Sequence, residues 1–320
     1  MTGTVHFVQP DLASPSGGNV YNRRLAEGLA ALGWTVRLAR EVESVPDGAI
    51  ALVDGLVASA IPEVLVAQAH RLRLVPLMHM PLFTAGEREM LHAAAAIVVT
   101  SQWSASRLAD LGADLEVHVA PPGVDAVPLT AFDERGRRLL CVAAVTPAKG
   151  HDALIEALSH VDGDWRCVCV GPLDRDPAFA RGLSTLDGRV DFIGAIGGRE
   201  VDERYGEADL LVFPSRAETF GMVVTEALAH GIPVLATDVG GIPEAMGLAN
   251  DGSLPGMLVP AGDPRALASA LRRWLGESAL RERLRMAARE RRATLHGWDH
   301  TAAVVSRALT EVGAGARVVR

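Results

Sequence analysis

The sequence predicts an α/β protein with two doubly wound parallel sheets. Its 320 residues are enough for two domains of about 150 residues each. Short β-rich runs alternate with helical stretches, and this alternation builds parallel sheets with helices on both faces. The alternation stops at Pro121-Pro122-Gly123 and in the irregular, charged stretch 127–138, which we interpret as the linker between the domains.

The first series of elements begins with an apolar strand near the N-terminus. An amphipathic helix follows it and ends at Gly33, a typical helix-stop residue. The expected strands span residues 5–8, 35–39, 49–53, 74–79, 97–100 and 116–120, and the expected helices span 19–32, part of 58–70, 85–95 and 103–111.

The second series repeats the same alternation after the linker. Ligands collect at the carboxyl ends of strands in such sheets, so we expect two such edges to face each other across a cleft. The expected strands lie near 139–145, 166–170, 190–193, 210–213, 234–236 and 257–259, with helices between them and at 264–275, 278–295 and 300–312.

The composition describes a soluble globular protein, with 49% hydrophobic and 22% charged residues. A net charge of −8 gives no basic face, so we expect no nucleic-acid partner. The chain starts directly with an apolar strand and has no run of 18 apolar residues, so we expect neither a signal peptide nor a membrane span. Arg71 and Arg73 beside leucines are interpreted as a solvated helix end, which leaves no strong membrane signal.

The three cysteines, Cys141, Cys167 and Cys169, all lie in apolar runs. Without a C-x-x-C motif or a nearby histidine at ligand spacing, we interpret them as small hydrophobic residues of buried strands. A redox pair or a metal site is the alternative. No disulfide framework is expected, which fits a reducing cytoplasm.

Lys149 is the single lysine among 31 basic residues. Arginine has become the default cation of this chain. A lysine retained in such a background indicates a position where a compact ammonium serves and a planar guanidinium does not.

The segment with the clearest chemistry is PSRAETFG, residues 214–221, which leaves a strand and opens a helix that runs to about His230. The first backbone N–H groups of a helix have no intrahelical partner and form an anion site. Glu218 precedes this helix and Glu226 lies within it, and eight helical residues span about 12 Å. One carboxylate can therefore accept hydrogen bonds from a sugar and the other from a ribose, with a diphosphate between them.

The stretch PSRAETFGMVVTEALAHGIPVLATDVGGIPE, residues 214–244, resembles the signature of glycosyltransferase family 4, including its pair of glutamates separated by seven residues. These are retaining enzymes of the GT-B fold. Gly17-Gly18, His79, Pro122-Gly123-Val124-Asp125 and Lys149-Gly150 resemble further family motifs in the expected order.

The resemblance implies an acceptor domain at 1–127 and a nucleotide-sugar donor domain at 128–298, with a final helix at 299–320 that crosses back onto the first domain. It implies a retaining hexosyltransferase that uses a nucleotide-diphosphate sugar, with UDP first among the nucleotides, and a small acceptor. It implies no metal and no other cofactor.

The resemblance also assigns roles to residues. Lys149, Glu218 and His79 are the expected catalytic group: Lys149 contacts the leaving diphosphate, and His79 hydrogen-bonds the transferred sugar and is not the general base. Asn19 and Tyr21 would border the acceptor. The expected donor-binding residues are Gly17, Gly18, Ile193, Thr219, Phe220, Gly221, Met222, Val223 and Glu226.

One position departs from the family pattern. Family members usually carry Gly-Arg five residues before the lysine, where this chain has Ala143-Ala144. Either Arg216 or Arg175 replaces the missing arginine, or Lys149 and the helix amides suffice, or catalysis is weak or absent. Loss of one charge-assisted hydrogen bond costs about 1.5–3 kcal/mol.

Three other functions stay open. An epimerase or phosphorylase on the same frame would need additional acid–base residues, which the sequence does not offer. The Ala143-Ala144 departure allows a non-catalytic nucleotide-sugar binding protein. A dinucleotide-dependent oxidoreductase is disfavoured because no G-x-G-x-x-G follows the first strand of either half.

Overall fold

A computed structural model describes residues 3–10, 16–110 and 116–315 of the chain. They divide into two compact units, one formed by Met1–Gly123 with His296–Arg320 and the other by Val124–Leu295. The first division falls four residues before the expected boundary at 127, and the second falls three residues before the expected boundary at 298. The expected helix ends at Leu111 and Arg320 lie outside the described residues.

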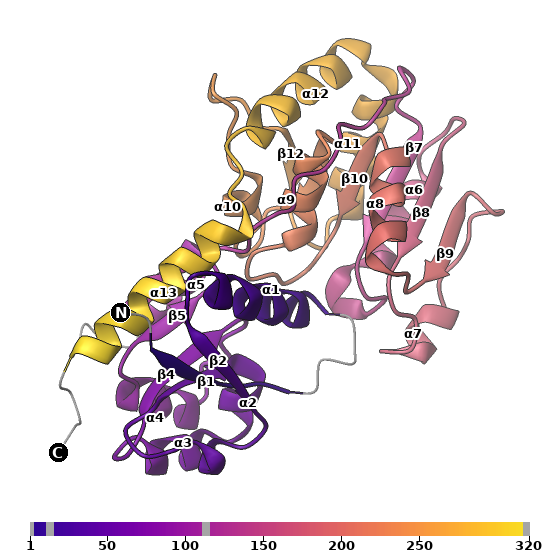
Figure 1. Ribbon diagram of the computed structural model, residues 1–320. Helices are drawn as coiled ribbons and strands as arrows, with labels where there is room; N and C mark the ends of the chain where they lie inside the picture. The colour runs from indigo at the N-terminus through magenta and orange to yellow at the C-terminus, as the bar shows by residue number, and fades with distance from the viewer. Residues whose placement is uncertain (1–2, 11–15, 111–115, 316–320) are drawn as a thin grey trace. The chain divides into compact units, whose positions relative to one another are not determined.

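The first unit contains a six-stranded parallel sheet in the order β2-β1-β3-β4-β5-β6 (Figure 1). Residues alternate between its two faces, so neighbours on one strand enter different hydrophobic cores. In the middle strand, Leu52 packs with helices α1 and α13, whereas Ala51 and Val53 pack with α3, α4 and α5. The strands are β1 (Thr4–Val8), β2 (Thr35–Ala39), β3 (Ile50–Asp54), β4 (Arg73–Met78), β5 (Ile97–Val99) and β6 (Val117–Val119); the helices are α1 (Gly17–Ala31), η1 (Val42–Ser44), α2 (Gly55–Ala60), α3 (Pro62–Gln68), α4 (Ala85–Ala93), α5 (Gln102–Ala109) and α13 (Trp298–Ala314).

The stretch expected to hold one helix within 58–70 contains two. α2 ends at Ala60 and α3 begins at Pro62. Proline has no backbone N–H to continue a helix, and its fixed φ suits the first helical position, so it ends one helix and starts the next.

The last helix of the chain belongs to the first unit, where it packs along α1. The two helices approach closely at Gly28, where an added Cβ would lie 2.6 Å from the Cβ of Ala302. Val305, Leu309 and Val312 of α13 enter the same core as α1 and the sheet. The sheet is therefore covered on one face by a helix 180 residues further along the chain.

The second unit has the sheet order β12-β11-β10-β7-β8-β9, again entirely parallel. One face packs against α6 and α11 and the other against α8, α9 and α10, and α12 contributes side chains to both cores. The strands are β7 (Arg138–Val142), β8 (Arg166–Val170), β9 (Val190–Gly194), β10 (Leu210–Phe213), β11 (Val234–Thr237) and β12 (Gly256–Val259); the helices are η2 (Pro147–Lys149), α6 (His151–Ser159), α7 (Pro177–Arg181), α8 (Gly198–Glu207), α9 (Met222–Ala229), α10 (Ile242–Met246), α11 (Pro264–Gly276) and α12 (Ser278–Arg292).

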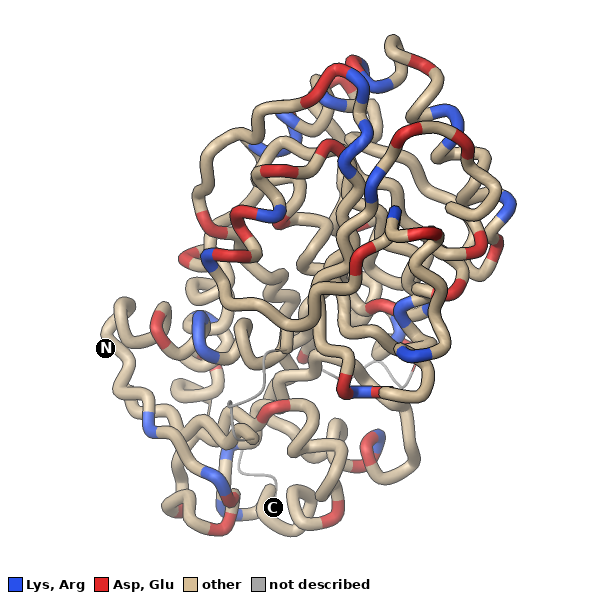
Figure 2. Tube along the Cα trace, turned by 90° about the vertical axis from the view of Figure 1, so that its right-hand side faces the viewer, with Lys and Arg blue, Asp and Glu red and all other residues tan. Residues whose placement is uncertain are grey.

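Charged residues of both signs are interleaved along both units (Figure 2). Within the described residues, no helix is both long enough and apolar enough to cross a membrane. The two doubly wound sheets confirm the fold class that the sequence predicts.

Candidate active site

The turn that carries Lys149 in the second unit depends on a glycine. Gly150 has a φ of 71°, a left-handed conformation, and a Cβ there would lie 2.1 Å from the carbonyl oxygen of Pro214. Glycine therefore lets this turn lie directly against the loop that leaves β10. The backbone N–H of Arg216 donates to the carbonyl of Ala148 (2.8 Å), which joins the two loops.

This contact brings Lys149 to Glu218. The Lys149 ammonium donates to Glu218 Oε2 at 2.5 Å, and both side chains are only partly exposed. The same ammonium lies 5.7 Å from the centre of the Phe213 ring. Two residues 69 apart in the sequence thus form one ion pair at the carboxyl edge of the sheet.

The first turn of α9 lies next to this pair. Gly221 caps the helix with a φ of 91°, and its carbonyl accepts from the Val224 N–H at 2.9 Å. The amides of Met222 and Val223 stand before that bond, at the position where helix N–H groups have no intrahelical acceptor. The helix therefore begins where the sequence predicts it, and the binding of an anion by its first amides stays a prediction.

Gly240-Gly241 supports the 218–223 segment from behind. A Cβ at Gly240 would lie 1.6 Å from the carbonyl oxygen of Glu218, and one at Gly241 would lie 2.1 Å from that of Thr219. Phe220 is buried, with 6% exposure, and packs into the core beneath. The two glycines are required because their backbone lies against that of the Glu218 loop.

Glu226 lies within α9 and accepts a hydrogen bond from the Tyr205 hydroxyl at 2.8 Å. Burial raises the pKa of Glu226; the Tyr205 hydrogen bond partly opposes this, and the carboxylates of Asp202 and Asp125 add to the increase. Tyr205 itself is buried in α8 and stacks on His230 with ring centres 5.2 Å apart.

Ile193 lies at an irregularity of the edge strand β9. Cys169 pairs with Phe192 and Val170 pairs with Gly194, so the register skips Ile193. The extra residue of a β-bulge is left out of the strand ladder. The bulge therefore lies at the end of β9, at the residue that is expected to contact the base.

Arg216, an expected substitute for the missing arginine, lies next to the Lys149 turn and pairs with Asp152. Arg216 forms a bidentate ion pair with Asp152 at 2.7 and 2.8 Å and donates to the carbonyl of Pro147 at 2.5 Å. The Arg216 guanidinium holds the pKa of Asp152 below its ordinary value. Arg216 thus fixes the turn before Lys149. Arg175, the other expected substitute for the missing arginine, is exposed in the loop between β8 and α7.

In the first unit, His79 directly follows β4 and belongs to a buried polar group. Its Nε2 lies 2.9 Å from Asn22 Oδ1 and 3.3 Å from Asp54 Oδ2, while the Asn22 amide donates to Asp54 Oδ2 at 2.6 Å. Burial raises the pKa of Asp54, but hydrogen bonds from His79, Asn22 and the Leu56 N–H outweigh burial and hold it below its ordinary value. Nε2 is thereby committed to this network, so Nδ1 is the ring nitrogen left for a ligand.

The glycine loop lies beside the same histidine. α1 begins at Gly17, and a Cβ added at Gly18 would lie 3.6 Å from His79 Cδ2. Asn19 is partly exposed, and its backbone N–H donates to the Ser16 hydroxyl at 3.2 Å. Tyr21 is only 1% exposed; its hydroxyl donates to the carbonyl of Ala120 at 2.8 Å, and its ring meets that of His79 edge-on. The expected acceptor-side role of Tyr21 is therefore corrected to support of His79 from the core.

Sequence reasoning missed Asn22, Asp54 and Tyr205. A signal existed for Asp54, because it ends the strand beside β4 and the carboxyl ends of neighbouring parallel strands meet at one edge. Asn22 also had one, since it lies one helical turn after Gly18. For Tyr205 there was none, because packing of α8 against α9 alone places it.

Two groups of side chains among the described residues could hold a metal ion. Glu116, His118 and Glu311 lie at the surface of the first unit, with His118 Nε2 at 3.3 Å and 3.8 Å from the two carboxylates. The buried group in the second unit is Cys141, His151 and Cys169. The sequence shows no histidine at ligand spacing from the cysteines, but the turn between β7 and α6 brings His151 next to two of them.

Comparison with known proteins shows which proteins the chain resembles. Residues 136–277 match the family described as glycosyl transferases group 1. The D-inositol 3-phosphate glycosyltransferase of Xylanimonas cellulosilytica is 34% identical over 245 residues, which are 69% of this chain and 58% of that protein. The protein of the same name from Jonesia denitrificans is 33% identical over 249 residues, 68% of this chain and 57% of its own. The chain thus spans less than three fifths of these curated relatives.

Solved structures share the fold. Sucrose-phosphate synthase from Thermosynechococcus elongatus matches with a TM-score of 0.77 at 21% identity, over 98% of this chain and 99% of that one. HepE of Anabaena, solved with UDP and glucose, matches with a TM-score of 0.75 at 17% identity, over 97% and 100%. The chain thus has the GT-B glycosyltransferase fold, is similar over most of its length to glycosyltransferases, and in residues 136–277 matches the glycosyltransferase group 1 family, glycosyltransferase family 4.

Proposed function

We propose that this protein is a retaining glycosyltransferase that moves a sugar from a nucleotide-diphosphate donor to a small acceptor. The observation that carries the proposal is the Lys149–Glu218 ion pair, which lies beside the first turn of α9 with Glu226 further along the same helix. A cation, a set of helix amides and two carboxylates are the groups that a diphosphate flanked by two sugars would need.

In the proposed reaction, the bond between the sugar C1 and the diphosphate oxygen breaks while the acceptor oxygen bonds to C1 on the same face. The departing diphosphate takes the acceptor proton. Negative charge grows on the leaving oxygen, and Lys149 with the amides of Met222 and Val223 stabilises that charge. No metal is assigned a role, because fixed donors already face the leaving group.

The remaining second-unit residues would orient the donor. Glu218 would accept hydrogen bonds from hydroxyls of the transferred sugar, and Glu226 would accept from the ribose hydroxyls. Ile193 would pair with the edge of the base through its backbone groups at the β9 bulge. The HepE structure contains UDP and glucose, and its shared fold makes UDP the first nucleotide to test here.

In the first unit, His79 would hydrogen-bond the transferred sugar. Asn22 and Asp54 hold its Nε2 side, which directs Nδ1 toward a ligand. Gly17-Gly18 would bring backbone close to the donor phosphate or the acceptor, and Asn19 would border the acceptor. The sequence relatives are named for D-inositol 3-phosphate, so a small phosphorylated polyol is the acceptor we propose to test first. The three buried, free thiols fit an enzyme of the cytoplasm.

The test is direct incubation of the purified chain with UDP-, GDP- and ADP-sugars and inositol phosphates. Transfer is detected by mass spectrometry as a hexose-sized gain on the acceptor, and retention by NMR of the anomeric proton. We expect transfer with a UDP-sugar. Binding of UDP without transfer to any acceptor would instead favour a non-catalytic nucleotide-sugar binding protein, which Ala143-Ala144 also allows. No response to any of the three diphosphates would contradict the donor site.

Two variants separate binding from chemistry. Lys149→Ala removes a charge-assisted interaction with the diphosphate, worth about 1.5–3 kcal/mol, so UDP should bind about 10- to 150-fold more weakly by calorimetry. Glu218→Ala should abolish transfer and leave UDP affinity within a few-fold of the parent. Arg199→Ala is the matched control, because its side chain is 93% exposed in the same unit. Unchanged UDP binding by Lys149→Ala would remove our account of the leaving group.

A further inference from the structure

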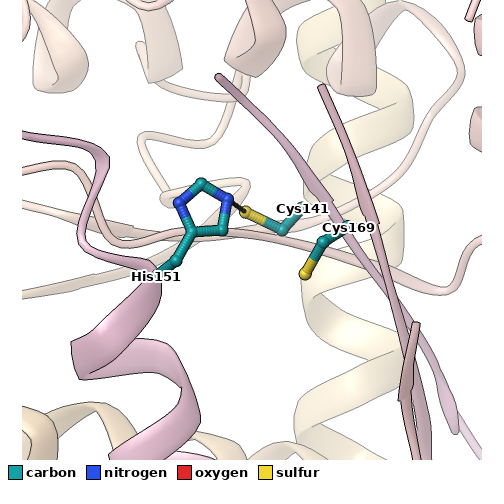
Figure 3. Close-up of side chains that lie close together, drawn as sticks. All are labelled: Cys141, His151 and Cys169. Carbon is teal, nitrogen blue, oxygen red and sulfur yellow. Dashed lines mark hydrogen bonds between the residues drawn. The ribbon is translucent and has the colours of Figure 1, made fainter. Parts of the chain in front are cut away.

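The core of the second unit contains a polar group that the proposed transfer does not use. Cys141 and Cys169 are 0% exposed and lie directly opposite each other on the neighbouring strands β7 and β8. His151, also 0% exposed, is the first residue of α6, and one nitrogen of its ring points at the Cys141 sulfur, with Cys169 next to Cys141 (Figure 3). One ligand atom from each of the three residues lies within 4.8 Å of the others.

Packing alone does not explain this group. The surrounding core consists of aliphatic and aromatic side chains, where an imidazole costs free energy unless it is hydrogen-bonded. Nδ1 of His151 is buried without a hydrogen-bond partner, so no carbonyl or carboxylate holds that side of the ring. The other ring nitrogen, Nε2, lies 3.7 Å from Cys141 Sγ.

The spacing of these atoms fits ligands of one metal ion. With metal–sulfur bonds of about 2.3 Å and metal–nitrogen bonds of about 2.0–2.1 Å, a sulfur and a nitrogen on the same ion lie about 3.5 Å apart in tetrahedral geometry and about 3.8 Å apart in trigonal geometry. The observed 3.7 Å falls between these values. A small closure of the three side chains would therefore complete the coordination.

The donor set and the charge select the kind of ion. Two sulfurs and an imidazole are soft or intermediate ligands, which favour Cu⁺ and Zn²⁺ over Mg²⁺ or Ca²⁺. Zinc in a structural site takes four ligands, and the group found within the described residues offers three. An ion of the Cu⁺ class therefore matches three soft or intermediate ligands better, and a monovalent cation brings less charge into a dry core than Zn²⁺ does.

We propose that Cys141, His151 and Cys169 form a buried binding site for a soft monovalent metal cation of the Cu⁺ class. The cation replaces any proton on the ligating Cys141 sulfur, bonds to His151 Nε2 and takes a third bond from the Cys169 sulfur. The site is separate from the proposed donor site. The metal site and the proposed donor site are nevertheless neighbours in the sequence, since His151 follows Lys149 and Gly150.

The experiment uses the full, reduced chain with Ag⁺ as an air-stable probe and with Cu⁺ supplied anaerobically from a chelator of known affinity. We expect one ion per chain to survive gel filtration, new ultraviolet absorption from thiolate-to-metal charge transfer, and a higher midpoint of thermal unfolding. Cys141→Ala and His151→Gln should each lower the affinity at least tenfold. Cys167→Ala is the matched control, because Cys167 is a third thiol of the same core that lies outside the group.

Several outcomes would overturn the proposal. Equal retention by Cys141→Ala and the parent, loss of the ion in Cys167→Ala alone, or tight binding of Zn²⁺ with none of Cu⁺ would each contradict it. Should the variants fail to fold, X-ray absorption of the copper-loaded parent decides the question. Two sulfurs and one nitrogen around the copper support the site, and a shell without nitrogen or with a single sulfur rejects it. None of these readouts depends on transferase activity, so the proposed function can fail independently.

Discussion

At the scale of single residues, Glu218 and Glu226, the two glutamates of the proposed donor site, lie in different surroundings. Glu218 pairs with the ammonium of Lys149, whereas Glu226 lies beside the Tyr205 hydroxyl, where burial raises its pKa. Ionised Glu226 therefore costs folding free energy at neutral pH. A group that destabilises the folded chain and faces a proposed ligand is typical of a functional position.

Glu226→Gln tests this cost. Because the folded-state pKa lies above the unfolded one, the ionised carboxylate destabilises the fold as pH rises through that pKa. At pH 8 we expect the free energy of unfolding of Glu226→Gln, measured in urea, to equal or exceed that of the parent. UDP should bind the variant more weakly by calorimetry. A variant that loses stability without losing UDP affinity would make Glu226 a purely structural residue.

Asp54 shows the opposite shift. Its pKa is held below the ordinary value of 3.8, so the stability it contributes is present above pH 3.8 and is lost as pH falls through the lower folded-state pKa. We expect Asp54→Asn to be less stable than the parent at pH 7, with the difference shrinking below about pH 4. Urea unfolding at several pH values measures it. Asp110→Asn is the control, because the Asp110 carboxylate is 69% exposed in the same unit.

At the scale of elements, the Lys149 turn depends on the close contact between two loops. Gly150 is the residue that allows this contact, because it combines a left-handed backbone with a Cβ position 2.1 Å from the Pro214 carbonyl oxygen. Gly188 has a similar φ of 77°, but a Cβ there would meet nothing within 4 Å. Comparing alanine substitutions at Gly150 and Gly188 therefore separates the cost of backbone strain from the cost of steric collision.

We expect both alanine variants to incur the left-handed backbone cost of about 1–2 kcal/mol. Gly150→Ala should lose more, because its Cβ also pushes the two loops apart, and it should weaken UDP binding by displacing Lys149. Urea unfolding and calorimetry measure the two effects. Equal costs for Gly150→Ala and Gly188→Ala would contradict the loop contact.

At the scale of the whole molecule, the two units differ in how the chain builds them. The second unit is one continuous segment, Val124–Leu295, with its own cores on both faces of its sheet. The first unit needs two segments, because α13 supplies Val305, Leu309 and Val312 to its core. Each such buried side chain contributes about 1.5–3 kcal/mol.

Truncation after Leu295 should therefore affect the units unequally. We expect the first unit to lose several kcal/mol, which unfolds it or lowers its thermal transition. The second unit should keep its fold and still bind UDP, with a lower affinity if Gly17-Gly18 contacts the donor phosphate as proposed. Calorimetric scans of the parent and the truncated chain, with and without UDP, distinguish the two. Loss of UDP binding on truncation would contradict an independently folded second unit.

The fold class, the strands and most of the helices could be predicted from the amino-acid sequence, and so could the resemblance to a family. Periodicity and helix-stop signals are local, so the strand at residues 210–213 and the helix from 264 emerge from short windows of the chain. The PSRAETFG segment predicted its own strand–turn–helix geometry for the same reason. The sequence also singled out Lys149, because it is the one lysine of the chain, but it did not predict that Lys149 pairs with Glu218.

Which side chains contact one another could be learned from the three-dimensional structure alone. The Lys149–Glu218 pair, the Tyr205–Glu226 hydrogen bond and the His79 network join residues that are 69, 21 and 57 positions apart. Such contacts depend on strand order and helix packing, which local patterns leave open. For the same reason the sequence did not predict the Cys141–His151–Cys169 group. The two cysteines become neighbours because β7 and β8 pair in register, and the start of α6 brings His151 next to them.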